Sequence, residues 1–237
     1  MALDSPKRED LGYVLHSRRF RENSLLVDVL SREHGRTSLI ARAPSKAKSR
    51  LGESLQPFRL VQLTFSGRGD LFTLHQVEPT GPLRFLQGDR LLSGMYVNEL
   101  LVRLTGRGEG EQALFDLYAQ VIDELSGVAP LEPTLRRFEV ALLEVCGYGL
   151  PLHETWTDQS PVAPDAQYRY VIEQGPERVN EEAGTSSVSG AMLLALAGEQ
   201  AFTAETLAQA KHFMRGVLRH YLGEKPLHAR SLFTADR

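Results

Sequence analysis

The chain has 237 residues and a formal net charge of −3, from 27 Lys and Arg against 30 Asp and Glu, a length that suits one large domain or two small ones. It lacks an apolar run of about 18 residues that could span a bilayer, and its first residues are too polar for a secretory signal, so we expect a cytoplasmic protein with no membrane partner. The single cysteine, Cys146, excludes an internal disulfide and any zinc site with several cysteines.

The first 80 residues predict a series of short β-strands. Apolar and polar residues come close to alternating within each strand, and Gly, Asn or Ser separates one strand from the next. The five predicted strands lie in LGYVLHSRRF, NSLLVDVLSRE, GRTSLIARA, FRLVQLTFSGRGD and LFTLHQVEPTG. Five short strands with basic loops between them favour the small barrel known as the oligonucleotide-binding (OB) fold. An SH3-like barrel would give a similar pattern.

Basic residues gather in this predicted barrel. Residues 1–79 hold 13 Lys and Arg against 9 Asp and Glu, whereas the rest of the chain holds 14 against 21. Residues 32–50 alone contribute six bases and one acid, and we expect the part that begins at Ala41 to be a loop. Such asymmetry indicates a polyanionic partner for the barrel. The alternative is a solvated surface on which charges cluster by chance.

From about residue 83 the apolar period becomes helical. Pro133 near the start and Gly147 at the end delimit the clearest predicted helix. The helices are predicted in RLLSGMYVNELLVRL, ALFDLYAQVIDEL, PTLRRFEVALLEVCGYG, SGAMLLALAGEQ and AETLAQAKHFMRGVLRHYLG. We therefore predict an α+β protein in which an OB-fold barrel over residues 1–80 precedes a mainly helical domain over residues 81–237. A polar, partly irregular insertion near residues 151–190 contains one strand or hairpin at QYRYVIEQ.

The sequence shows no arrangement of residues typical of an active site. The seven histidines are scattered, and SGRGD lacks the ending and the strand-to-helix context of a phosphate-binding loop. Motifs for a serine nucleophile, paired carboxylates or a dinucleotide are also missing. We therefore expect a binding protein rather than an enzyme, without a cofactor and without a metal.

Several ungapped motifs occur along the chain in a characteristic order. They are GYVLHSRRFRENSLLVDVLSREHGR, LQPF, SGRGDLFTL, YVNELL, LRRFEVALLEVCGYG and KPLHARSLF. In these motifs the chain resembles the RecO family of bacterial recombination mediators between residues 11 and 233. The resemblance implies binding of single- and double-stranded DNA and annealing of complementary strands. It also implies work with RecR, and with RecF as a further partner, to load RecA onto DNA coated by the single-stranded-DNA-binding protein. Some family members hold zinc through four cysteines, and this chain should fold without it.

Basic side chains on a loop of Ser, Ala and Pro can follow a phosphate backbone without reading bases, because release of counterions supplies the affinity. The predicted phosphate contacts are Arg36, Arg42, Lys46, Lys48, Arg50 and Arg68. Aromatic side chains that could stack on bases are also present, but their position in apolar strands favours core packing. These aromatic residues are Phe58, Phe65 and Phe72.

Two further sites are predicted in the helical part. Three bases spaced four apart on the last helix would either extend the DNA track or only solvate the surface; they are Lys211, Arg215 and Arg219. The resemblance implies that the acidic tail of the single-stranded-DNA-binding protein docks on the helical domain. We match Arg136 to the terminal carboxylate of that tail, with Val140 and Val145 in or near the pocket. The alternative is that Arg136 pairs with Glu132 or Glu139.

The leading prediction is thus a DNA-binding recombination mediator in DNA repair, working at the nucleoid. An OB-fold protein that binds RNA without sequence preference is the first alternative, because the barrel and its basic loop do not distinguish RNA from DNA. An enzyme with an unrecognised site is the second alternative.

Overall fold

The computed structural model describes residues 6–42, 48–81, 84–108, 110–179 and 187–229. The chain packs into two compact units. Unit 1 comprises residues 1–127 with 228–237, and unit 2 comprises residues 128–227. The first two long helices therefore pack with the barrel, while the domain boundary expected after residue 80 stays a prediction.

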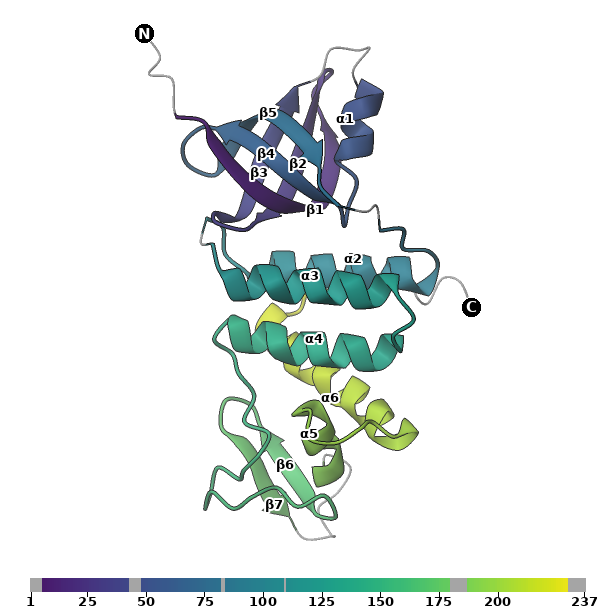
Figure 1. Ribbon diagram of the computed structural model, residues 1–237. Coiled ribbons are helices and arrows are strands. Elements are labelled where there is room, and N and C mark those ends of the chain that lie inside the picture. Colours follow the sequence, from purple (N-terminus) through teal and green to yellow (C-terminus); the bar gives the residue numbers. More distant parts are fainter. Residues whose placement is uncertain (1–5, 43–47, 82–83, 109, 180–186, 230–237) are drawn as a thin grey trace. The chain divides into compact units, whose positions relative to one another are not determined.

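Unit 1 begins with a closed five-stranded barrel (Figure 1). Its strands are β1 (Arg8–Phe20), β2 (Ser24–Ser31), β3 (Gly35–Arg42), β4 (Leu60–Ser66) and β5 (Leu71–Pro79). They follow the order β1-β2-β3-β5-β4, and only the β3–β5 pair among them is parallel. The predicted α+β class and the five-stranded barrel are confirmed.

The barrel interior is filled mainly by residues that alternate along β2, β3 and β4, as the two-residue period of a strand requires. The buried cluster consists of Val14, Val27, Val29, Leu39, Ala41, Leu55, Val61, Leu63, Phe65 and Leu74. Phe58 is also buried, whereas Phe72 is partly exposed. The expectation that these phenylalanines pack in the core is therefore met by Phe58 and Phe65.

A short helix, α1 (Lys48–Ser54), lies in the basic stretch that was expected to be a loop. Leu51 and Leu55 are four residues apart, and both pack against the barrel core. Two apolar side chains at that spacing meet the same surface only if the backbone turns helically between them. Packing on the barrel therefore explains the helix.

One buried amide joins strand β1 to two helices in unit 1. Helices α2 (Asp89–Leu104) and α3 (Gln112–Ser126) follow the barrel. Asn98 on α2 donates a 2.7 Å hydrogen bond from Nδ2 to the carbonyl of Leu15 on β1. Its Oδ1 accepts one of 2.7 Å from the hydroxyl of Tyr118 on α3. Asn98 thus fixes both helices to the barrel.

Unit 2 contains three helices and a small sheet in the described part of the chain. The helices are α4 (Leu131–Val145), α5 (Gly190–Leu196) and α6 (Ala204–Leu222). Strands β6 (Gln167–Val171), β7 (Gly175–Val179) and β8 (Val188–Ser189) form a sheet in the order β7-β6-β8. The element expected at QYRYVIEQ is the β6–β7 hairpin.

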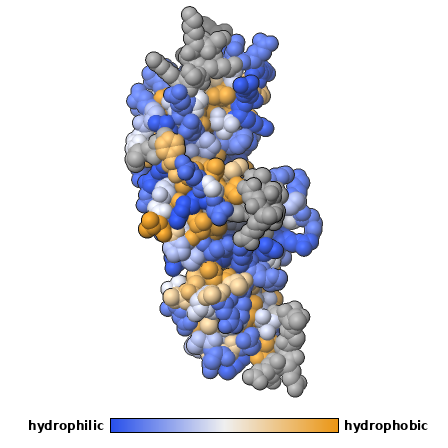
Figure 2. Space-filling view, turned by 90° about the vertical axis from the view of Figure 1, so that its right-hand side faces the viewer, coloured by the Kyte–Doolittle hydropathy of each residue, from blue (hydrophilic) through white to orange (hydrophobic). Residues whose placement is uncertain are grey.

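Hydrophilic and apolar side chains are interspersed on the face of the molecule that Figure 2 shows. Among the described residues, none of the helices combines the length and the apolar character needed to cross a membrane.

Candidate nucleic-acid interface

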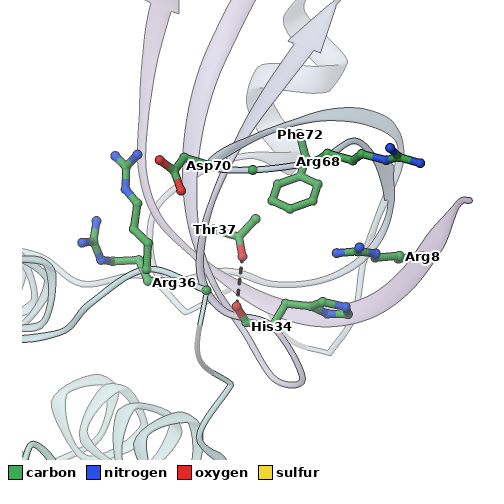
Figure 3. A pocket seen from close by; sticks show the side chains of 10 residues that line it. Arg8, His34, Arg36, Thr37, Arg68, Asp70 and Phe72 are labelled. Carbon is green, nitrogen blue, oxygen red and sulfur yellow. Dashed lines mark hydrogen bonds between the residues drawn. The ribbon is translucent and has the colours of Figure 1, made fainter. Parts of the chain in front are cut away.

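Four chain segments of unit 1 surround one hollow at an end of the barrel (Figure 3). They are the start of β1, the β2–β3 turn, the β4–β5 turn and the segment that follows α2. The hollow has a volume of about 340 Å³ and is lined by Arg8, His34, Arg36, Thr37, Arg68, Gly69, Asp70, Phe72, Arg107 and Gly108. We call it the arginine hollow after Arg8, Arg36, Arg68 and Arg107.

Strand pairing brings these segments together. Arg8 pairs with Phe65 at the end of β4, and Ser38 pairs with Leu71 at the start of β5. The beginnings of β1, β3 and β5 therefore meet at the same end of the barrel. Gly69, with a φ of 74°, lies in the left-handed region that favours glycine, and it allows the tight turn that carries Arg68.

The segment after α2 is attached to the β2–β3 turn by its backbone. The N–H of Gly108 donates to the carbonyl of Arg36 at 3.3 Å, and Nη2 of Arg36 donates to the carbonyl of Thr105 at 3.1 Å. Gly110 lies so close to the carbonyl of Glu33 that a Cβ there would collide with it. These contacts hold Arg107 at the edge of the hollow.

A buried carboxylate fixes the β2–β3 turn from the other side. Asp10, which is 5% exposed, accepts hydrogen bonds from the Ser31 hydroxyl, from the N–H of Glu33 at 3.0 Å and from Nδ1 of His34 at 2.9 Å. Asp10, Glu33 and His34 also offer ligand atoms within 4.8 Å of one another, as a metal site would. The three donors on the Asp10 carboxylate already account for this cluster, and we assign it a structural role.

Acids in the described part of the chain compensate the arginines of the hollow at most in part. None of the four forms an ion pair with a carboxylate among the described residues. Asp70 is the one acid among the described lining residues. Burial lowers the pKa of Arg36, the charge of Arg107 lowers it further, and Asp28 partly opposes both. The hollow therefore concentrates positive charge in a chain of net negative charge, which favours an anion.

An aromatic wall lies between the charges. The guanidinium carbon of Arg8 is 5.4 Å from the centre of the Phe72 ring, which meets the buried Phe65 ring edge to face. Figure 3 shows Phe72 and Thr37 between Arg8 on one side and Arg36 on the other. One face of Phe72 is therefore occupied by Arg8 and one edge by the core.

The six predicted phosphate contacts are distributed over the barrel. Arg36 and Arg68 line the hollow. Arg42 is exposed at the opposite end of β3, on the order of 20 Å from Arg36 at ~3.3 Å per residue. Lys46 lies outside the described residues. Lys48 and Arg50 belong to α1, whose backbone alone is described at these positions.

Sequence reasoning missed Arg8 and Arg107. Each stands outside the basic stretch of residues 32–50, and neither belongs to a motif. Only the closure of the barrel and the return of the chain after α2 bring them to Arg36. The nearest local signal is the glycine content around Arg107, since Gly106 and Gly108 flank it and indicate a turn.

In unit 2, Arg136 is 4% exposed and donates a 2.5 Å hydrogen bond from Nη2 to Oε1 of the buried Glu139. Val140 and Val145 are partly buried on the same helix. The structure therefore contains the Arg136–Glu139 pair, which is the alternative to the tail pocket. The tail pocket stays a prediction.

The three bases on α6 are exposed. Nζ of Lys211 lies 2.6 Å from Glu132, and Nη2 of Arg219 lies 3.0 Å from Glu224. Two of the three therefore form ion pairs with carboxylates. A DNA track along α6 stays a prediction.

Family models match nearly the whole chain. The model of the recombination protein O N terminal region matches residues 7–83, and the model of the C terminal region matches residues 86–231. The chain is 41% identical to the DNA repair protein RecO of Aromatoleum aromaticum over 220 residues, which cover 92% of each chain. It is 38% identical to that of Azoarcus sp. over 234 residues, covering 97% of this chain and 96% of the relative. With the protein of Alkalilimnicola ehrlichii it shares 42% identity over 225 residues, covering 94% and 89%.

Proposed function

Because the chain belongs to the recombination protein O family, whose members are DNA repair proteins and act as non-enzymatic recombination mediators, we propose that it anneals complementary strands coated by the single-stranded-DNA-binding protein. We propose further that it acts with RecR to promote loading of RecA. Single- and double-stranded DNA would be its ligands, and RecF a further partner.

The observation that carries this proposal is the arginine hollow. Guanidinium groups bind phosphate through paired hydrogen bonds and do not need a particular base. On a single strand, log K should fall with log salt by ~0.7 for each phosphate that the protein neutralises. Binding should therefore be tolerant of sequence and strongly dependent on salt.

The aromatic residues of the barrel support a surface that contacts backbones. Phe58 and Phe65 are buried, so they offer no face to a base, and Arg8 lies over the ring of the partly exposed Phe72. Bases that are not stacked on protein stay free to pair with a complementary strand. A surface that screens the charge of two backbones and leaves their bases accessible is suited to annealing.

The partners that we propose for the helical part are inferred from the family and not from the geometry of unit 2. The tail of the single-stranded-DNA-binding protein would bind near Arg136, Val140 and Val145, and the exposed bases of α6 would extend the DNA track. Reversing the charge of Lys211, Arg215 and Arg219 together should lower DNA affinity; unchanged affinity would remove α6 from the track.

The experiment that tests the function is annealing of two complementary oligonucleotides, each coated with the single-stranded-DNA-binding protein, at low and at high salt. The protein should accelerate annealing at low salt, and the effect should fade at high salt. A folded protein that gives no acceleration at low salt would overturn the proposal. Affinities for matched DNA and RNA oligonucleotides would then test the RNA-binding alternative.

A further inference from the structure

We propose that the arginine hollow binds a terminal phosphate of a nucleic-acid strand, a phosphomonoester, in preference to the phosphodiesters within the strand. This inference rests on the proposed function, because it takes the ligand to be a nucleic acid. It adds that the protein recognises strand ends.

The shape of the site favours an end over a continuous backbone. The four arginines come from four separate segments and surround one hollow, whereas a backbone track needs cations in a row. Figure 3 shows Arg8 and Arg36 on opposite sides of Thr37 and Phe72. A phosphodiester inside a strand needs room for the chain on both sides, but a terminal phosphate enters from one side only.

The size of the hollow fits the same ligand. Its volume of about 340 Å³ corresponds to roughly eleven water molecules at ~30 Å³ each. This is room for a phosphate with its sugar and is at the low end of small-ligand pockets. The partly exposed ring of Phe72, held by Phe65 and Arg8, would form an apolar wall beside the sugar.

The charge of the hollow also exceeds what one phosphodiester can neutralise. Four arginines face one acid, Asp70, among the described lining residues. A phosphomonoester carries about −1.5 to −2 charge at pH 7 and three strong acceptor oxygens. A phosphodiester carries a single charge and has fewer free oxygens. The doubly charged group is therefore the better match.

The charge of Arg36 is only partly compensated by its neighbours. Its Nη2 has the carbonyl of Thr105 as a partner, but its Nε is buried and has no acceptor among the described residues. Burial and the neighbouring Arg107 lower the pKa of its guanidinium. An anion in the hollow would relieve the repulsion between Arg36 and Arg107.

The test uses three single-stranded oligonucleotides of one sequence with an internal fluorophore, bearing a 5′-phosphate, a 3′-phosphate or hydroxyls at both ends. Anisotropy titrations of the full chain at low salt should show that one phosphorylated strand binds about five- to tenfold tighter than the hydroxyl strand, as expected for added charge-assisted hydrogen bonds. Equal affinities for all three strands would overturn the inference and leave the proposed function intact. No binding of any strand would instead overturn the proposed function.

Two variants locate the preference. Arg36→Gln combined with Arg107→Gln should bring the ratio of affinities close to one. Arg42→Gln is the matched control, because Arg42 is an exposed arginine of the same strand at its other end. Arg42→Gln should weaken the binding of all three strands equally and leave the ratio of their affinities unchanged. If the double variant keeps the same ratio of affinities, the preference for a terminal phosphate cannot be assigned to the hollow.

A competition distinguishes strand ends from free nucleotides. A nucleoside monophosphate carries the same phosphomonoester without a strand. It should displace the phosphorylated strand only at concentrations far above that of the strand, because the other backbone contacts are missing. Displacement at equal concentrations would assign the hollow to free nucleotides and overturn the recognition of strand ends.

Discussion

Oδ2 of Asp10 lies 2.9 Å from Nδ1 of His34, and the same oxygen accepts hydrogen bonds from Ser31 and from the backbone of Glu33. One buried carboxylate on β1 thus holds the whole β2–β3 turn. Arg36 follows this turn directly, so the geometry of the arginine hollow depends on an acid that does not line it.

Asp10→Ala should therefore lower the free energy of unfolding by about 2–4 kcal/mol, because the buried Ser31 hydroxyl and the partly buried Glu33 N–H would lose their acceptor. Urea unfolding followed by circular dichroism measures the change. The control is Asp70→Ala, an exposed acid of the same end of the barrel, whose loss should change stability by less than ~0.5 kcal/mol. Equal effects of both variants would contradict the role of Asp10.

Asp70→Asn should tighten the binding of DNA. Asp70 is the one acid among the described residues of the hollow, and it opposes the approach of phosphate. Removing an exposed like charge should raise affinity about two- to threefold at low salt and have little effect at high salt. Anisotropy titrations at two salt concentrations measure the change. An affinity that is unaltered at low salt would place the bound phosphate away from Asp70.

Arg107→Gln should stabilise the free protein while weakening its binding of DNA. Arg107 repels the partly buried Arg36, so its loss should raise the free energy of unfolding by up to about 0.5 kcal/mol at low salt. The same change removes a phosphate contact and should make the salt dependence of DNA binding less steep. Denaturation and titration of the same preparation measure both effects. A variant that loses stability would show that Arg107 has a structural role.

The barrel could be predicted from the sequence because its signals are local. Alternating apolar residues such as those around Gln62 and Thr64, followed by SGRGD, indicate a strand and a turn without any knowledge of the partner strand. The helix α1 could not be predicted in this way. Its reason is the contact of Leu51 and Leu55 with the barrel core, which the chain alone does not show.

Only part of the candidate site could be predicted, because only part of it gives a local signal. The cluster of charges indicated Arg36, and the predicted hairpin turn indicated Arg68. Arg8 and Arg107 reach the hollow through the closure of β1 onto β4 and the attachment of the segment after α2. Both are long-range features of topology, so no pattern within a short window contains them.

Stability should fall in alkaline solution because of Tyr118. Burial raises the pKa of its hydroxyl well above the usual value, Tyr13 raises it further, and the hydrogen bond with Asn98 opposes both. Above about pH 10 the unfolded chain releases a proton that the folded chain keeps, so the free energy of unfolding falls as pH rises.

The slope for this one group approaches 1.4 kcal/mol per pH unit. Tyr118→Phe should make the fall less steep. At pH 7 the Tyr118→Phe variant should have a free energy of unfolding about 1–2 kcal/mol lower, because Oδ1 of Asn98 loses its hydrogen-bond donor. Urea unfolding at a series of pH values measures both effects, with the exposed Tyr148→Phe as control. An unchanged slope in Tyr118→Phe would contradict the assignment.

The pair formed by Arg136 and Glu139 determines how the predicted tail pocket can be tested. Both side chains are buried, so Arg136→Ala would remove the arginine that pairs with Glu139. The free energy of unfolding should then fall by about 3–5 kcal/mol. A loss of tail binding in that variant could follow from unfolding alone. Arg136→Lys keeps the charge and should remain folded, but it loses the planar fork that binds a carboxylate through two hydrogen bonds.

If Arg136 holds the terminal carboxylate of the tail, Arg136→Lys should weaken binding of a tail peptide about fivefold or more while DNA affinity stays unchanged, because a bidentate contact becomes a single one. Arg137→Ala, at an exposed position one residue further on, is the control and should alter neither affinity. Fluorescence anisotropy with a labelled tail peptide measures the effect, and a thermal melt shows that the variant is folded. Full tail affinity in a folded Arg136→Lys variant would limit Arg136 to its pair with Glu139.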